Sequence, residues 1–163
     1  MINGTMCFLT SEGQTLFLYR NRGKDDIHNG WYVPPGGRLE RGERSIDCVI
    51  REFEEETGLG LVDPRLRLIA TFFNEGRVLG GKENPEDWRV EVYESSAFNG
   101  RLKKERPEDG LVWVPDSEIS KVRMYEGDRK IFDLIMKQRG VFEVVLQYSK
   151  EELIRFDCKR AYP

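Results

Sequence analysis

Short apolar runs alternate with polar segments along most of the chain, and this pattern predicts a protein rich in β-strands. Strands are predicted at residues 5–10, 14–20, 66–73, 88–98, 110–115, 141–149 and 152–160. The polar, Gly-containing connection between the first two favours a hairpin. Residues 21–30 form a polar, Gly-rich loop, and the longest break, residues 74–87, has the length and glycines of a loop that covers a substrate.

Two longer segments have the periodicity of helices. Residues 45–57 carry apolar side chains at i, i+3, i+4 and i+7: Ile46, Val49, Ile50 and Phe53. Ser45 is the expected N-cap of this helix, and Gly58 the left-handed residue that ends it. A short helix is expected to start within residues 116–120, and an amphipathic helix spans 128–138. The element order predicts a single α/β domain over residues 1–163.

Composition narrows the functional classes. Apolar residues make up 39% and charged residues 34%, as in ordered globular proteins. The 26 basic and 29 acidic residues give a net charge of -3, so no general field attracts a nucleic acid polymer or an anionic membrane. No basic and apolar leader opens the chain, and no later stretch approaches 18 apolar residues, which predicts a soluble cytoplasmic protein.

Cysteine and histidine usage argues against several kinds of site. Cys7, Cys48 and Cys158 are far apart and lack metal-binding spacing, so they are expected to be buried hydrophobic residues rather than disulfide partners or zinc ligands. His28 is the sole histidine, and no nucleophile motif lies near it. A Ser-His or Cys-His catalytic triad is therefore disfavoured.

The segment "REFEEETGL" concentrates negative charge on one helix. At about 100° per residue, Glu52, Glu55 and Glu56 fall on one edge of the apolar face, whereas Glu54 points away and Arg51 lies where it can pair with Glu55. Carboxylates this close repel one another unless a cation lies between them. Hard oxygen ligands suit Mg²⁺ or Mn²⁺. The alternative for an isolated Glu triplet is a solvated acidic face on a surface helix.

The spacing of the surrounding residues favours the metal site. The pattern G-x5-E-x7-R-E-U-x-E-E-x-G-U has seven fixed identities: Gly37, Glu43, Arg51, Glu52, Glu55, Glu56 and Gly58. Their chance coincidence is on the order of 10⁻⁹ per starting position at average residue usage. Residues 37–59 therefore resemble the Nudix box, and the chain is similar to Nudix hydrolases, which cleave a nucleoside diphosphate linked to another group. The resemblance implies a mixed β-sheet sandwiched between α-helices, with the box as loop, helix and loop.

The resemblance also implies roles for particular residues. The implied ligands of Mg²⁺, or of Mn²⁺ as a substitute, are the Gly36 carbonyl and the carboxylates of Glu52, Glu55, Glu56 and Glu108. Glu52 is the first choice for the base that activates a water molecule. Glu43 and Arg51 are implied to hold the box together by ionic contacts.

Similarity to MutT-type enzymes of the 8-oxo-dGTP class implies how a nucleotide is bound. Arg20 matches a basic phosphate-binding position, and Arg38, a further candidate for binding the substrate, follows the glycine pair where relatives have a basic residue. Asp128 matches an aspartate that contacts the base. Tyr32 or Tyr125 are candidates for stacking on the base. The alternatives are that the arginines are ordinary surface cations, that Asp128 caps the last helix and that Tyr32 belongs to the core.

The predicted activity is hydrolysis of a phosphoanhydride bond in a free or oxidised purine nucleoside triphosphate, giving the monophosphate and pyrophosphate. Val33 stands where several purine triphosphatases use an asparagine, so a preference for 8-oxoguanine stays open, and Phe53 replaces a usual aliphatic residue of the box. Marks of the NADH, ADP-ribose and dinucleoside polyphosphate branches are absent. A hydrolase of ADP-ribose or nucleotide sugars and a non-catalytic nucleotide-sensing module remain as alternatives. The expected partner is a small nucleotide, bound by a monomer or homodimer.

Overall fold

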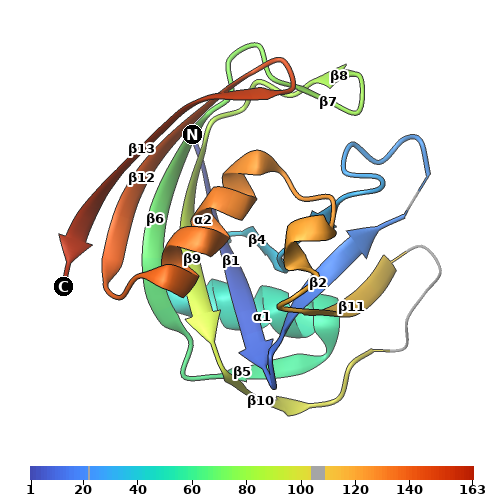
Figure 1. The fold of residues 1–163 in the computed structure, drawn as a ribbon, viewed down its shortest axis with the longest axis vertical. Coiled ribbons are helices and arrows are strands. Elements are labelled where there is room, and N and C mark those ends of the chain that lie inside the picture. The colour runs from blue at the N-terminus through green and yellow to red at the C-terminus, as the bar shows by residue number, and fades with distance from the viewer. Residues whose placement is uncertain (22, 104–108) are drawn as a thin grey trace.

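The computed structural model describes residues 1–21, 23–103 and 109–163, and a mixed sheet runs through them with a helix against each face (Figure 1). The strands are β1 (Ile2–Ser11), β2 (Gln14–Arg20), β3 (Tyr32–Val33), β4 (Gly36–Arg38), β5 (Leu59–Val62), β6 (Arg65–Phe73), β7 (Val78–Leu79), β8 (Lys82–Glu83), β9 (Trp88–Ser95), β10 (Ala97–Gly100), β11 (Asp109–Pro115), β12 (Val141–Ser149) and β13 (Glu152–Tyr162). The helices are α1 (Ser45–Thr57), the short 3-10 helix η1 (Ile119–Lys121) and α2 (Glu126–Lys137).

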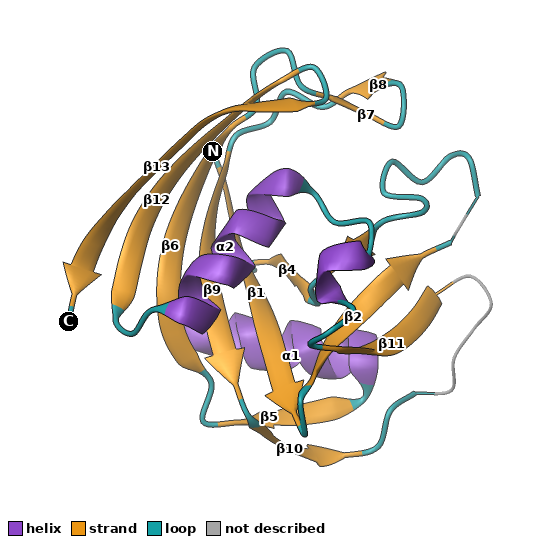
Figure 2. Ribbon diagram, viewed as in Figure 1, coloured by secondary structure: helices purple, strands orange, loops and turns teal. Residues whose placement is uncertain are grey.

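Nine of these strands form the main sheet within the described residues. Its order is β11-β2-β1-β9-β6-β12-β13, with β3 added to β2 and β4 added to β1 (Figure 2). β1 runs parallel to β9, and β6 runs parallel to β12, whereas the other pairings are antiparallel. β4 brings the start of the box beside the middle of β1, which fixes where α1 begins.

The sandwich follows from the alternation of side chains along the strands. In β1, Phe8 joins the core on the α2 side, together with Ile131 and Phe132 of that helix. Its neighbour Leu9 joins the core on the α1 side, together with Phe53. The predicted mixed sheet between helices is confirmed.

The helix expected at residues 45–57 has these bounds, and Gly58 ends it with φ of 82°. The expected cap was wrong, because Arg44 is the N-cap and Ser45 is already helical. The Ser45 hydroxyl instead contacts the hydroxyl of Tyr93, at 3.0 Å. The last helix starts at Glu126, two residues earlier than predicted, so Asp128 lies in its first turn rather than capping it.

Other differences arise where short strands pair over long sequence distances. The strand predicted at residues 88–98 is divided into β9 and β10, and β10 pairs with β5, which was not predicted. The segment 74–87 contains the small β7–β8 hairpin. Cys7 and Cys48 are buried as expected, whereas Cys158 is exposed. No helix among the described residues is long and apolar enough to cross a membrane.

Candidate active site

Arg51 is the centre of the ionic contacts in the box. Its Nε donates to Glu43 Oε1 at 2.8 Å, and its second terminal nitrogen donates to Glu43 Oε2 at 2.9 Å. The other terminal nitrogen donates to Glu52 Oε1 at 2.7 Å and lies 3.3 Å from Glu55 Oε2. These hydrogen bonds lower the pKa of Glu43 to about 2. Arg51 therefore joins the loop before α1 to two of the acidic residues on the helix.

The third acidic residue faces the glycine pair. Glu56 Oε1 accepts a hydrogen bond from the backbone N–H of Gly36 at 2.8 Å. A Cβ on Gly36 would lie 2.8 Å from Met6 Cα and closer still to the carbonyl oxygen of Thr5. A Cβ on Gly37 would lie 2.7 Å from Glu52 Oε1 and closer still to the rest of that carboxyl group. Both positions therefore require glycine, for different reasons. Gly36 lets β4 pair with β1, and Gly37 leaves room for the Glu52 carboxyl group.

The donors around these glycines fit a hard divalent cation in their chemistry, because every candidate ligand supplies oxygen. Among the described residues, however, no three acidic, histidine or cysteine side chains converge on one point. Arg51 engages Glu52 and Glu55, and the Gly36 N–H engages Glu56. Binding of Mg²⁺ would require these carboxylates to exchange such contacts for the ion. Glu108, the remaining predicted ligand, lies outside the described residues.

A cavity of about 610 Å³ opens beside the glycine pair. Gly37 and Glu56 of the box border it, together with Gly36, which directly precedes the box. The remaining walls come from β1, β2, β3, β6, β9, the loop at residues 21–30, the segment 74–87 and the start of α2. This volume is in the range of small-molecule sites. The cavity thus lies between the start and the helix of the box on one side and loops, strands and the start of α2 on the other.

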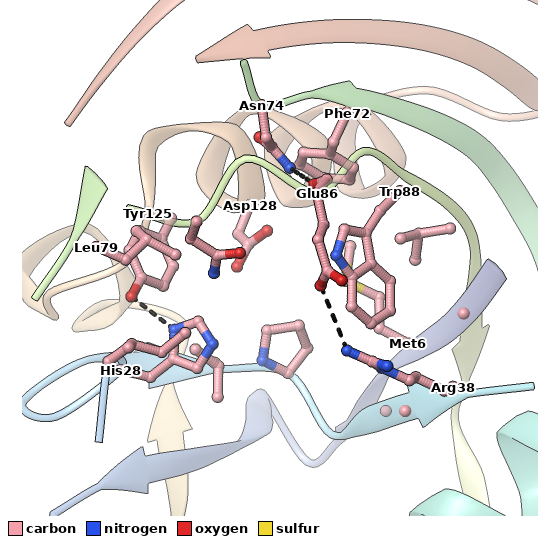
Figure 3. Close-up of a pocket in the computed structure, with 18 of the residues that line it drawn as sticks. Met6, His28, Arg38, Phe72, Asn74, Leu79, Glu86, Trp88, Tyr125 and Asp128 are labelled. Carbon is pink, nitrogen blue, oxygen red and sulfur yellow. Dashed lines mark hydrogen bonds and ion pairs between the residues drawn. The ribbon is translucent and has the colours of Figure 1, made fainter. Parts of the chain in front are cut away.

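Charged and aromatic side chains lie together in two parts of this cavity (Figure 3). Arg38 forms an ion pair with Glu86 at 3.6 Å and lies over the Trp88 ring, 5.1 Å from its centroid. In the part near Asp128, His28 Nδ1 lies 2.7 Å from the Tyr125 hydroxyl. Burial, with a smaller contribution from Arg20, lowers the pKa of His28 to about 4, so the ring is neutral at pH 7.

Asp128 is the acidic residue at the α2 end of the cavity. Burial raises the pKa of its carboxyl to about 6, and the nearby Arg77 opposes that shift. The carboxyl is therefore mainly ionised at pH 7 and can accept hydrogen bonds from a ligand.

The structure brings together only some of the predicted site residues. Those on the cavity wall are Arg20, Gly36, Arg38, Glu56, Tyr125 and Asp128. Arg20 is held by Asp26 through hydrogen bonds of 3.0 and 3.2 Å. Glu52, Glu55 and Tyr32 are not among the described residues that line it. The Tyr32 ring packs against Tyr19 with centroids 4.9 Å apart, and it borders the core on the α2 side.

Several residues on the wall were not singled out by the sequence. Asn74 and Arg77 come from the segment 74–87, and Trp88 follows it. A lone arginine in a Gly-rich loop is usually solvated, so the composition of the segment 74–87 gave no sign that Arg77 is buried. The expectation that this segment covers a substrate was the signal that pointed to its residues.

Comparisons with known proteins identify the family and the fold. The NUDIX domain model matches residues 2–135. An uncharacterized Nudix hydrolase of Bacillus subtilis (strain 168), YvcI, is 31% identical over 153 residues, covering 93% of this chain and 90% of its own length. The crystal structure of a mutator MutT protein from Bacillus halodurans superposes with a TM-score of 0.81 and 28% identity, covering 98% of each chain.

A more distant structure has the same fold. It is the NUDIX domain of NrtR from Shewanella oneidensis, solved in complex with ADP-ribose. The TM-score is 0.64 with 11% identity, and the superposition covers 82% of this chain and 84% of that one. At this identity the similarity concerns the fold alone.

Proposed function

The chain belongs to the Nudix hydrolase family, and we propose that it hydrolyses a purine nucleoside triphosphate, free or oxidised, to the monophosphate and pyrophosphate. The observation that carries this proposal is a single cavity that Glu56 of the box borders on one side and Asp128 on the other. A nucleotide placed there has its phosphates near the glycine pair and its base near an acidic hydrogen-bond acceptor. The MutT protein from Bacillus halodurans supports the MutT-type assignment, because its fold covers nearly the whole chain.

In this proposal the residues that hold Mg²⁺ are Glu52, Glu55, Glu56 and the Gly36 carbonyl. The ion supplies positive charge that the polyphosphate requires and makes a water molecule more acidic. Glu52 takes the proton from the attacking water, for which its place between Arg51 and the open Cα of Gly37 is suitable. Arg51 keeps that carboxyl in one orientation, and Glu43 in turn holds Arg51.

Two groups in the cavity bind the substrate. Arg38 is exposed in its ion pair with Glu86, so a phosphate can replace the Glu86 carboxylate as its partner. Asp128 accepts hydrogen bonds from N–H groups of the base. Water leaves the aromatic and apolar part of the wall when the base enters, which favours binding by burying apolar area.

A panel of nucleotides tests this function. GTP, dGTP, 8-oxo-dGTP, ATP and dATP are each incubated with the protein and Mg²⁺, and monophosphate and pyrophosphate are measured together. The proposal expects equal amounts of both products from at least one purine triphosphate, and none after addition of EDTA. ADP-ribose belongs in the same panel, because its cleavage gives AMP and ribose 5-phosphate without pyrophosphate. Cleavage of ADP-ribose alone would assign the chain to the alternative hydrolase class, and binding without cleavage would assign it to the sensing class.

A further inference from the structure

The outer edge of β13 is a long strand edge that pairs with nothing in the part of the chain that the structure describes. β13 has 11 residues and is bonded to β12 along one side only, at the end of the strand order (Figure 1). Such an edge exposes a row of backbone N–H and C=O groups that can bond to a further strand. Proteins often prevent this pairing with a short edge strand or a proline, and neither occurs within Glu152–Tyr162. The edge is therefore open to a partner strand.

The middle of β13 is regular enough to accept such a strand. Its pairing with β12 shifts register near both ends, but it runs without a shift from Arg155 to Arg160. Within this stretch the side chains alternate between the two faces of the sheet. Those on the α2 face are Phe156, Cys158 and Arg160, opposite core residues of β12, and those on the other face are Arg155, Asp157 and Lys159. Phe156 is partly buried and the others are exposed.

The charges along β13 restrict how two copies of it can pair. Two identical strands that pair antiparallel about a two-fold axis place one residue opposite its own copy, and its neighbours opposite each other in reverse order. With Asp157 on the axis, two aspartates meet and Arg155 lies opposite the partner's Lys159. With Arg155, Lys159 or Arg160 on the axis, two cations meet at the centre. With Cys158 on the axis, Asp157 lies opposite the partner's Lys159 on both sides of the centre, and both pairs attract.

One other arrangement avoids repulsion, with Phe156 on the axis and Arg155 opposite the partner's Asp157. It pairs only residues 155–157 of the regular stretch with one another and leaves Tyr162 uncovered. The arrangement with Cys158 on the axis pairs residues 156–160 with one another and brings Ile154 opposite the partner's Tyr162. Apart from Met1, Ile154 and Tyr162 are the most exposed large apolar side chains in the described part of the chain, at 55% and 65%. The axis at Cys158 therefore satisfies the charges, the regular backbone and the apolar side chains together.

We propose that β13 is a dimerisation edge, where it pairs antiparallel with β13 of a second copy of this chain about an axis at Cys158. The sheets of the two subunits become continuous, and main-chain hydrogen bonds together with burial of Ile154 and Tyr162 supply most of the affinity. The exposed ion pairs add little energy, but they select the register. Pairing along one strand edge is small compared with a standard protein interface, so we expect a dissociation constant on the order of 10 μM.

The dimer would also steady the wall of the cavity, because the β12–β13 hairpin supports that wall. The Tyr148 hydroxyl of β12 accepts a hydrogen bond from the Gly127 N–H, in the first turn of α2, at 2.7 Å. In the turn between the two strands, the Lys150 carbonyl accepts from the Val78 N–H at 2.7 Å, and the Lys150 N–H donates to the Gly76 carbonyl at 2.8 Å. Association at β13 should therefore make the Tm rise with protein concentration.

The first test uses Cys158 as a reporter of the axis. Opposite residues of an antiparallel pair have Cα atoms about 4.5 or 5.5 Å apart, and both distances suit a disulfide. The protein is treated with diamide at about ten times the expected dissociation constant. Two Cys158 thiols give up two protons and two electrons to the diamide, whereas Cys7 and Cys48 are buried. We expect a disulfide-linked dimer on a non-reducing gel, and none from Cys158→Ser.

Ile154→Cys in the Cys158→Ser background is the matched control for collisions between exposed thiols. Residue 154 lies opposite the partner's Tyr162 and not opposite its own copy, so this variant should form far less linked dimer. Phe156→Cys in the same background tests the other register. Equal cross-linking through residues 154 and 158, no cross-linking through Cys158, or cross-linking mainly through residue 156 would each overturn the proposal.

The second test exchanges the charges that face each other across the axis. Asp157→Lys and Lys159→Asp should each raise the dissociation constant roughly tenfold, because both attractive pairs become repulsive. The double variant Asp157→Lys/Lys159→Asp restores opposite charges without changing the net charge, so its dissociation constant should return close to that of the wild type. Lys121→Asp makes the same charge change at a 70% exposed side chain on η1 and should leave dimerisation unchanged.

Sedimentation equilibrium measures these constants, and circular dichroism shows whether each variant is folded. The two single variants carry opposite changes of charge, so either one with the double variant completes the comparison if the other does not fold. A wild-type chain that stays monomeric well above the expected constant, or a folded double variant that does not recover, would overturn the proposal. No nucleotide is needed in either test, so their outcome is independent of the proposed function.

Discussion

The adjacent glycines Gly36 and Gly37, where the box begins, provide a sharp test, because the same substitution should damage different properties at each. In Gly37→Ala the new Cβ would lie 2.7 Å from Glu52 Oε1 and closer to the other carboxyl atoms. Carbon atoms pack at about 3.5–4.0 Å, so the end of the Glu52 side chain must move by about 1 Å. A displacement of that size at a catalytic group lowers kcat by about 10²-fold. The flexible side chain can move without disturbing the sheet, so the Tm should stay close to that of the wild type.

Gly36→Ala is the matched control for Gly37→Ala. Its Cβ would meet backbone atoms of β1, at Thr5 and Met6, which cannot swing aside. Overpacking of this kind costs about 1–3 kcal/mol or more, which lowers the Tm by roughly 5 °C or more in a chain of this size. Thermal unfolding and steady-state kinetics of the two variants, with a triphosphate that the wild type cleaves, make the comparison. Wild-type kcat in a folded Gly37→Ala protein would refute the role given to the Glu52 carboxyl.

Three further predictions concern single side chains. Glu52→Gln should lower kcat by roughly 10²- to 10⁴-fold. Glu54 is exposed on the same helix, so Glu54→Gln should leave kcat unchanged and serves as the control. Equal rates of product formation by Glu52→Gln and the wild type would exclude Glu52 as the base. Burial raises the Asp128 pKa to about 6, so the folded state loses stability as pH rises from about 4 to 6. Asp128→Asn should therefore raise the free energy of unfolding at pH 7 by up to about 3 kcal/mol. Urea titrations should show that this gain vanishes near pH 3.5. Arg51 lowers the pKa of Glu43 to about 2, so the contribution of Glu43 to stability is present above about pH 4.5 and is lost as pH falls toward 2. Glu43→Gln should flatten the acid dependence of Tm seen for the wild type in that pH range. An unaltered dependence would contradict the ionic role of the Glu43–Arg51 pair.

The sequence predicted those parts of the fold in which local pattern and tertiary contacts agree. α1 has the predicted bounds because two local signals indicate the same helix. One is its apolar stripe, from which Phe53 enters the core, and the other is Gly58, which ends it. β5 was not predicted, because its four residues around Gly60 show no alternation of apolar and polar side chains. The strand forms only by pairing with β10, which lies far from it in the sequence. The error at Ser45 has a similar origin, since its hydroxyl finds a partner in Tyr93 of β9.

In the candidate site, too, residues whose contacts are local in sequence were predicted, and residues placed by distant elements were not. Arg51 and Glu55 lie one turn apart on α1, so their spacing alone predicted that they would lie side by side, as the structure confirms. Arg77 gave no such signal, because its burial depends on Tyr125 and Tyr148, which come from other elements. The roles of Arg20 and Tyr32 in binding a nucleotide stay predictions; Arg20 reaches the cavity while engaged with Asp26.

The last two strands have a consequence for how this protein can diversify. They follow the end of the matched NUDIX region at residue 135, yet Tyr148 and Lys150 support the cavity wall from there. In the proposed function, the acidic residues assigned to the chemistry and the C-terminal residues that support the cavity wall thus lie in separate stretches of the sequence. Mutation of the C-terminal hairpin and the segment 74–87 can explore new ligands while the helix that bears the acidic residues is left intact. For an engineer, these two stretches form one exchangeable module, which should be transplanted into a related enzyme together and never singly.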